Sequence, residues 1–180
     1  MSETRTTTAR LADLEPTCTP AEALALYDDL PAVRPDEITG RYRGRELGTG
    51  HPMDGLLEQS GWYGKQFDDV DHVHPLLFRT PGGEIFPVEP RKIPLGMVDK
   101  VPQAVVSRSR SAVGALKPAL RTSKHRARLR AVEHRGVVTA AMVYDHLPII
   151  DVFRRVDDDT LLGVMDLRGA PPYFFVLARD

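Results

Sequence analysis

The chain has 180 residues, of which 42% are hydrophobic and 27% charged, and its formal net charge is −1. This composition is typical of one globular domain, and the near-neutral charge argues against a dedicated nucleic-acid-binding protein. Cys18 is the single cysteine, which excludes an intramolecular disulfide and a thiolate metal cluster built from this chain alone. Because no apolar run has the length of a signal peptide or a membrane span, we expect a cytoplasmic protein without integral membrane association.

The first half of the chain predicts few regular elements. Residues 1–17 are polar and predict a disordered leader, and residues 18–180 predict a single β-barrel domain. A cap residue, a proline and an early glutamate predict a short helix over residues 19–30. Residues 38–44 alternate aromatic or β-branched with polar side chains and predict the first strand. Residues 54–62 predict a turn or two of helix that could serve as a lid.

The second half predicts a meander of strands. Residues 73–79 and 84–88 flank a glycine-rich turn and predict a hairpin, whereas four prolines favour a long loop with one short strand over residues 87–103. Residues 107–124 fit either a weak helix or a loop. Regular β-rich runs separated by turn residues then predict five antiparallel strands, typical of an up-and-down barrel or a sandwich: Ala127–Glu133, Val137–Tyr144, Ile149–Val156, Thr160–Leu167 and Tyr173–Ala178.

Several motifs in a fixed order resemble a known family. The spacing Gly40-x-Tyr42-x-Gly44 resembles the motif of the GXWXG family, with a tyrosine where that family has its tryptophan. Two segments that follow this motif also resemble the family: Gly48-Thr49-Gly50-His51-Pro52 and Gly61-Trp62-Tyr63-Gly64-Lys65. The C-terminal run looks like the domain of unknown function that usually follows GXWXG, and the likeness rests on Val137–Asp145, Asp151-x-Phe153, Val156-Asp157 and Leu162-Gly163-x-Met165-Asp166. The resemblance implies a GXWXG part over about residues 20–85 and a C-terminal strand meander over about residues 124–180.

A glycine-aromatic-glycine strand after a short helix also resembles the opening of calycins, which include lipocalins, fatty-acid-binding proteins and the haem-binding nitrobindins. That likeness implies a mainly β, calycin-like antiparallel barrel whose interior holds one small ligand. We therefore expect a fatty acid or similar lipid inside the barrel, with an arginine near the mouth for its anionic end. The expected ligand-binding residues are His51, Trp62, Phe78, Phe86, Tyr144, Phe153 and Phe175.

The six histidines suggest two further hypotheses. One is a haem or other tetrapyrrole barrel with a histidine as axial ligand. The other is a transition-metal site, because His72 and His74 would share one face of a strand, close to Asp69 and Asp71. An exposed strand face explains the same pattern, so we expect no metal. His51, in a glycine-rich loop, would either line a pocket mouth or fix its own turn.

One polar cluster is a candidate for catalysis. Asp145 and His146 end a predicted strand, and Asp151 follows in the next, so a short connection would bring them together at one rim. They would act as the acid and base of a small isomerase or lyase, or hold a ligand's polar group, or only pin the hairpin. Because the chain has no nucleophile elbow, phosphate loop or paired catalytic carboxylates, binding is favoured over catalysis, and we expect no cofactor.

The segment from residue 107 to 135 is strongly basic, with Glu133 as its single acid. Such a segment would attract an anionic group, and a ligand carboxylate is favoured over nucleic acid. Alternation of arginines with apolar residues over 126–131 also fits a strand with a solvated outer face. The sequence does not fix the oligomeric state.

Overall fold

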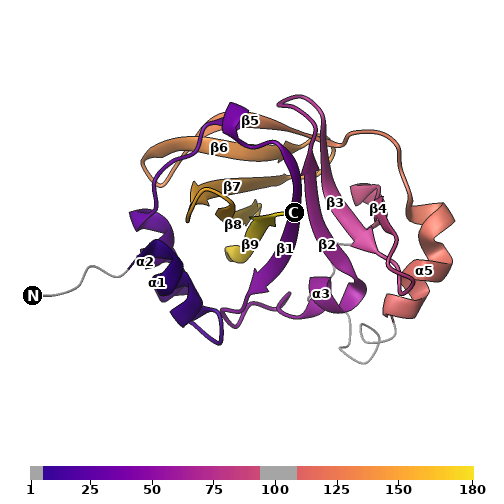
Figure 1. Ribbon diagram of the computed structural model, residues 1–180, viewed down its shortest axis with the longest axis horizontal. Helices are drawn as coiled ribbons and strands as arrows, with labels where there is room; N and C mark the ends of the chain where they lie inside the picture. Colours follow the sequence, from indigo (N-terminus) through magenta and orange to yellow (C-terminus); the bar gives the residue numbers. More distant parts are fainter. Residues whose placement is uncertain (1–5, 94–108) are drawn as a thin grey trace, which may run out of the picture.

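The strands form a closed antiparallel barrel in the computed structural model, which describes residues 6–93 and 109–180 (Figure 1). The described residues contain nine strands, in the order β2-β1-β9-β8-β7-β6-β5-β3-β4, and an additional β2–β3 pairing closes the ring. Their bounds are β1 Gly40–Leu47, β2 Trp62–Phe67, β3 Val73–Arg79, β4 Ile85–Pro87, β5 Ala127–His134, β6 Val137–Tyr144, β7 Ile149–Arg155, β8 Thr160–Leu167 and β9 Tyr173–Arg179. The predicted mainly β barrel fold is confirmed.

The ring is unevenly paired. Eight residue pairs join β5 to β6, whereas the register between β3 and β5 contains one pair, Val73 with Ala127. Two backbone hydrogen bonds reinforce this junction, from Arg126 N to the Val73 carbonyl at 3.0 Å and from Leu129 N to the Val70 carbonyl at 2.7 Å. We call this junction the β3–β5 seam, and it is the most sparsely paired contact between neighbouring strands of the ring.

Aromatic side chains fill the barrel interior, because inward-facing positions of a small barrel must pack against one another. Tyr42 on β1 is buried and meets Phe67 edge to face, with ring centroids 5.6 Å apart. Phe67 contacts Phe153, which in turn contacts Phe175, at 6.0 and 6.2 Å. Tyr42, the aromatic residue of the glycine-aromatic-glycine motif, therefore belongs to the interior core.

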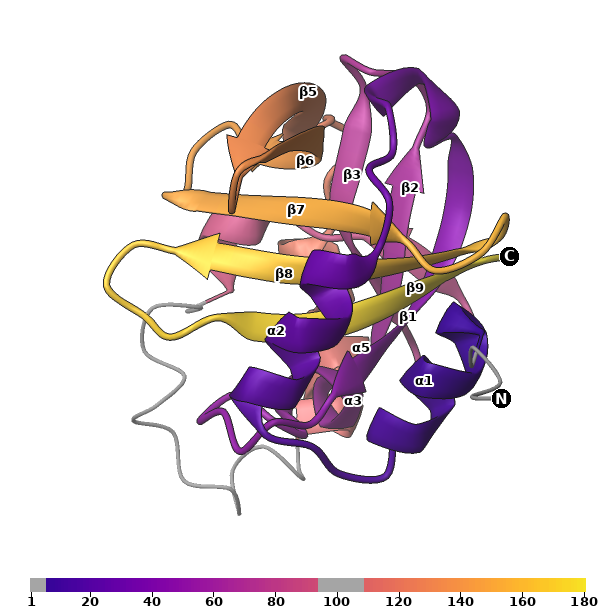
Figure 2. The same ribbon diagram turned by 90° about the vertical axis from the view of Figure 1, so that its left-hand side faces the viewer.

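Two N-terminal helices cover the outer face of β7, β8 and β9 (Figure 2). They are α1 (Thr7–Leu14) and α2 (Pro20–Asp29), and α2 begins with the expected cap, in which Thr19 and Glu22 satisfy each other's backbone N–H groups. Buried side chains of both helices form a second core with the outward-facing side chains of the sheet, for example Leu11 and Phe174.

The expectation of a disordered leader over residues 1–17 is wrong from Thr7 onward. Thr6 caps α1, the Thr7 hydroxyl donates to the Val156 carbonyl at 2.6 Å, and Leu11 is buried against the sheet. Sequence reasoning missed this helix because Leu11 and Leu14 are its only large apolar residues, and their contribution depends on a sheet surface formed far along the chain.

Short helices connect the remaining strands. They are α3 (Leu56–Ser60), α5 (Ser109–Leu120) and the 3₁₀ turns Pro35–Glu37 and Pro90–Lys92. The ambiguous segment 107–124 is thus helical from Ser109, while most of the loop predicted over 87–103 lies outside the described residues. Among the residues described, no helix combines the length and apolarity needed to cross a membrane.

Candidate functional site

A small cavity inside the barrel surrounds a buried ion pair. Its volume is about 20 Å³, room for about one water molecule. Lys65 and Asp151 both line it. The remaining lining is almost wholly apolar or aromatic: Met53, Leu57, Trp62, Leu76, Tyr144, Met165, Tyr173 and Phe175. The cavity thus presents one charged pair within an apolar wall.

Lys65 and Asp151 are almost completely removed from water. Lys65 Nζ lies 2.8 Å from Asp151 Oδ2, and the two side chains are 3% and 2% exposed. The ammonium also donates to the Pro75 carbonyl at 3.1 Å and lies 5.0 Å from the centroid of the Phe175 ring. Burying two charges costs several kcal/mol per ion, an expense that a purely structural core avoids with apolar side chains. The pair is therefore weak evidence for stability, and its place beside a cavity makes it a candidate binding site.

Asp151 keeps one carboxylate oxygen free. Its Oδ1 atom is buried and has no hydrogen-bond partner in the described part of the chain. Burial raises the pKa of this carboxyl, while the charge of Lys65 and its hydrogen bond act in the opposite direction. Burial and the charge of Asp151 raise the pKa of the Tyr144 hydroxyl. Asp151 can accordingly accept a hydrogen bond or a proton from a ligand.

Lys65 reaches the interior through an irregularity in β2. The pairing of β2 with β3 shifts register twice, between Trp62 and Gly64 and again between Gly64 and Gln66. In a regular strand, residues three apart point to opposite faces, so Trp62 and Lys65 would lie on opposite sides of the sheet. Both instead line the cavity. Sequence reasoning missed Lys65 for this reason, although a lone lysine among aromatic residues and glycines was the available signal.

Two glycines make this arrangement sterically possible. A Cβ atom on Gly44 would lie 2.3 Å from the Trp62 ring, so the indole rests directly on the backbone of β1. A Cβ atom on Gly64 would lie 2.0 Å from the carbonyl oxygen of Tyr42, where β1 and β2 approach each other. Gly44, the last glycine of the motif, therefore positions Trp62 as a wall of the cavity.

Helix α3 contributes to the lining of the cavity, and the carboxylate of Glu46 holds its start. Leu57 belongs to α3, and Met53 lies in the turn before it. Glu46 accepts hydrogen bonds from the backbone N–H groups of Gly55 at 2.9 Å and Leu57 at 3.3 Å, and from the hydroxyl of Tyr173. Burial raises the pKa of the Glu46 carboxyl. Glu46 thus fastens α3 to the barrel.

The wall residues predicted from the sequence separate into two groups. Trp62, Tyr144 and Phe175 line the cavity. The others are buried core residues that do not line it, namely Phe78, Phe86 and Phe153. All six are large aromatic residues on strands, and only the packing distinguishes a cavity wall from a filled core.

His51 fixes its own turn. Its Nδ1 atom accepts from the backbone N–H of Met53 at 3.0 Å, and Nε2 lies 3.2 Å from the Pro171 carbonyl. His51 is not among the residues that line the interior cavity. Of the two alternatives for His51, fixing its own turn therefore accounts for its contacts.

Asp145, His146 and Asp151 do not form one cluster. Asp145 pairs with Arg128 on the outside of the barrel, with Oδ1 2.6 Å from Nη2, and His146 is exposed in the turn. Asp151 lies opposite Met142 within the β6–β7 ladder and points inward. The predicted grouping is wrong. The short turn brings the ends of β6 and β7 together, but it does not place the three side chains on the same face of the sheet.

Most basic residues of the segment 107–135 have carboxylate partners where the structure describes them. Arg126 pairs with Glu89, Arg130 with Asp71 and Arg135 with Asp28, each at 2.6 or 2.7 Å. Arg108 lies outside the described residues, and so does the side chain of Arg110. This pairing favours the solvated-face interpretation of the basic segment.

A separate open groove also borders Trp62. It has a volume of about 430 Å³ and is lined by Arg43, Arg45 and Arg79 together with the Trp62 ring. Arg45 is paired with Glu15 at 2.5 Å. Glu58 also lines the groove, and Trp62 lines both this groove and the interior cavity.

Fold and site together define a small antiparallel barrel with a buried ion pair beside a mostly apolar interior cavity. Residues 25–83 match the family model described as GXWXG protein, and residues 125–179 match the one described as domain of unknown function (DUF4334). The chain belongs to the GXWXG family, with the DUF4334 domain following in the same chain.

One solved structure is similar over almost the whole length. It is a protein from Thermomonospora curvata that is 38% identical to this chain; the match covers 97% of this chain and 98% of that one, with a TM-score of 0.71. A comparison with curated proteins finds no match. The similarities establish family and fold, so the function has to be argued from the site.

Proposed function

We propose that the barrel binds a small, mostly apolar molecule whose single polar group is an oxygen held by Lys65. The observation that carries this proposal is a buried ion pair that lines a cavity while one carboxylate oxygen, Asp151 Oδ1, has no partner in the described part of the chain. A carbonyl or carboxylate oxygen would accept from the ammonium, and the apolar body would contact Trp62, Tyr144 and Phe175. Ligand pockets commonly combine an apolar wall with a few polar groups in this way.

Ligand size and access follow from the same contacts. Because only about 20 Å³ is free, a ligand must displace some of the lining side chains. Met53 and Leu57 are the ones contributed by α3 and the turn before it. Opening α3 breaks the hydrogen bonds to Glu46, which gives the helix the role of a lid. A short ligand requires less displacement of these side chains than a fatty acid does. A fatty acid as ligand, lipid binding in general and a cytoplasmic location stay predictions. A tetrapyrrole is disfavoured because the described residues that line the cavity include no histidine.

The free oxygen of Asp151 favours a second candidate function, a proton-transfer isomerase. Asp151 would remove a proton from the carbon between a carbonyl and a carbon–carbon double bond, and Lys65 would stabilise the negative charge on the carbonyl oxygen. Return of that proton to the far carbon would move the double bond into conjugation. This mechanism retains Asp151, which the sequence-based isomerase hypothesis also names. Lys65 takes the role that the hypothesis gave to Asp145 and His146.

Binding can be measured with Trp62, because it is the only tryptophan of the chain and lines the cavity. We expect saturable quenching of its fluorescence by small unsaturated ketones such as 3-cyclohexen-1-one or by short carboxylates such as hexanoate. Lys65→Met should abolish saturation, whereas the matched variant Lys124→Met, at an exposed position, should leave it unchanged. Equal quenching of all three proteins would refute the site.

Catalysis can be separated from binding with one variant. Incubation of the protein with 3-cyclohexen-1-one should produce the conjugated ketone, whose ultraviolet absorbance is readily followed. Asp151→Asn should lower that rate by about 10²–10⁴-fold, the usual contribution of a positioned base, while Trp62 quenching persists. Quenching without any conversion by the unmodified protein would leave binding as the function and exclude isomerisation of this ketone class.

A further inference from the structure

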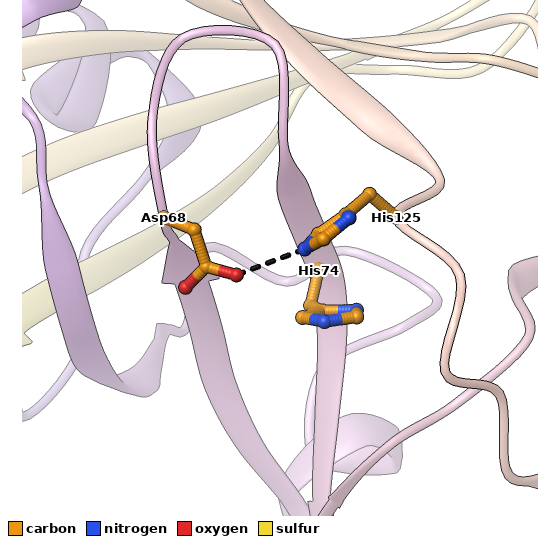
Figure 3. A group of neighbouring side chains, drawn as sticks. All are labelled: Asp68, His74 and His125. Carbon is orange, nitrogen blue, oxygen red and sulfur yellow. Dashed lines mark hydrogen bonds and ion pairs between the residues drawn. The ribbon is translucent and has the colours of Figure 1, made fainter.

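Three side chains from different parts of the chain converge outside the interior site, at the β3–β5 seam. They are Asp68, directly after β2, His74 on β3 and His125, two residues before β5. Each offers one ligand atom, and these atoms all lie within 4.8 Å of one another. Figure 3 shows the carboxylate of Asp68 joined to His125, with the ring of His74 beside them. Sequence reasoning paired His72 with His74 and could not include His125, which lies 51 positions further along the chain.

The three side chains contact one another closely. His125 Nε2 lies 2.8 Å from Asp68 Oδ2, and the rings of His74 and His125 are tilted at 33° with centroids 4.3 Å apart. The Nδ1 atom of His74 is buried and has no hydrogen-bond partner among the described residues. A metal ion about 2.0–2.2 Å from each ligand atom needs those atoms about 3.3 Å apart, which small side-chain rotations provide.

A second layer of contacts orients the ligands. The side-chain amide of Gln66 donates to the other carboxylate oxygen of Asp68 at 2.7 Å, which leaves Oδ2 for the metal side. The backbone N–H of Arg126 donates to the Val73 carbonyl, so the seam itself places His125 next to His74. Such outer contacts are typical of metal-binding carboxylates and imidazoles.

His72 and its neighbours complete the surroundings of the three side chains. Its Nδ1 atom lies 2.8 Å from both carboxylate oxygens of Asp69, so the ring has its own partner, although it touches His125 edge to face. Asp71 is paired with Arg130 at 2.7 Å. Asp68 and Asp69 instead have histidines, and no arginine or lysine, as their ion-pair partners among the described residues, which leaves their charge available to a cation.

We propose that Asp68, His74 and His125 form a binding site for a divalent transition-metal ion, best suited to Zn²⁺, that clamps the β2–β3 turn to the start of β5. Two imidazole nitrogens and one carboxylate oxygen are ligands that Zn²⁺ prefers, with a fourth, open position for water. The ion would tie together the seam at which the ring has a single residue pair in register. It would also steady β3, whose Pro75 carbonyl accepts from Lys65.

Metal binding is tested on the full chain after treatment with EDTA and removal of the chelator. Calorimetric titration with ZnCl₂ should give one ion per chain, and Co²⁺ should give the intense visible absorption of a four-coordinate ion. At a free Zn²⁺ concentration about 100 times the dissociation constant, Tm should rise by about 5–10 °C, because the ion binds the folded state only. Absence of saturable binding would overturn the proposal.

Variants locate the ion. Loss of a residue that only orients a metal ligand typically weakens metal binding by about 10–100-fold. His125→Gln and Asp68→Asn remove ligands themselves, so each should weaken Zn²⁺ binding by more than that. Asp68→Asn keeps the shape of the side chain and can still accept the hydrogen bond from Gln66 through its single amide oxygen, so its fold should persist, which circular dichroism checks. The matched controls His72→Gln and His146→Gln should bind Zn²⁺ like the unmodified chain. Equal weakening by His72→Gln, or undiminished binding by His125→Gln, would refute this ligand set.

Discussion

The buried pair of Lys65 and Asp151 can be tested by removing its positive partner. Lys65→Met keeps most of the aliphatic side chain and leaves the Asp151 carboxylate buried without its counter-ion. Breaking a buried ion pair in this way typically costs about 3–5 kcal/mol. We expect a loss of unfolding free energy of that order at pH 7, measured by urea denaturation with circular dichroism.

The carboxylate itself limits this cost. In the variant, Asp151 can fold as the neutral acid, and each pH unit above its ordinary pKa of 3.8 then costs about 1.4 kcal/mol. The penalty is therefore about 4 kcal/mol at pH 7 and about 2 kcal/mol at pH 5. Because the pKa of Asp151 in the folded variant is raised, stability falls as pH rises from 3.8 toward that pKa. The variant should thus regain stability relative to the unmodified chain on acidification.

Replacing both partners separates structure from function. Lys65→Met combined with Asp151→Val leaves no buried charge, and apolar replacements of buried ion pairs are often neutral or stabilising by about 1–4 kcal/mol. We expect the double variant to unfold at a urea concentration equal to or above that of the unmodified chain, while it loses Trp62 quenching by ligand. That combination would show that the pair is kept for the ligand.

An exposed pair on the same barrel provides the control. Arg128 and Asp145 lie 2.6 Å apart, with the Arg128 side chain half exposed, so Arg128→Met should cost less than about 1 kcal/mol. If Lys65→Met costs as little and shows no recovery at pH 5, the interior pair is hydrated and the reasoning fails. A double variant that is less stable than both single variants would likewise contradict it.

Three further perturbations test the packing and the electrostatics. Tyr42→Ala should cost about 3–5 kcal/mol in urea denaturation, because the ring is buried in the interior core, and a cost under about 0.5 kcal/mol would contradict that placement. Gly44→Ala should cost about 1–3 kcal/mol and shift the emission of Trp62 to longer wavelength, because its Cβ would lie 2.3 Å from the indole; unchanged emission would mean that the ring is not displaced. Burial lowers the pKa of His134 below its ordinary 6.5, so the unfolded chain binds more protons and unfolding free energy should fall as pH drops below about 6.5. His134→Gln should reduce this fall, and an identical pH profile for both proteins would exclude the effect.

The sequence by itself determined the fold class and most strands. Five C-terminal runs of β-rich residues between turns became β5 to β9, and the cap at Thr19 and Glu22 became the start of α2. These elements are encoded locally, by periodicity of 2 and by capping side chains, so no tertiary information was needed. The glycine-aromatic-glycine spacing likewise placed Tyr42 on β1.

Only the tertiary structure decided which side chains meet. Two register shifts in β2 turn Lys65 inward beside Trp62, and strand alternation, the rule that sequence reasoning applies, predicts the opposite face. Asp151 then meets a lysine 86 positions earlier in the chain, while Asp145 and His146 stay outside. His125 joins His74 only because the ring closes at the β3–β5 seam. Contacts across a closed sheet depend on register and on the facing of every intervening strand, and neither is encoded in a local stretch of sequence.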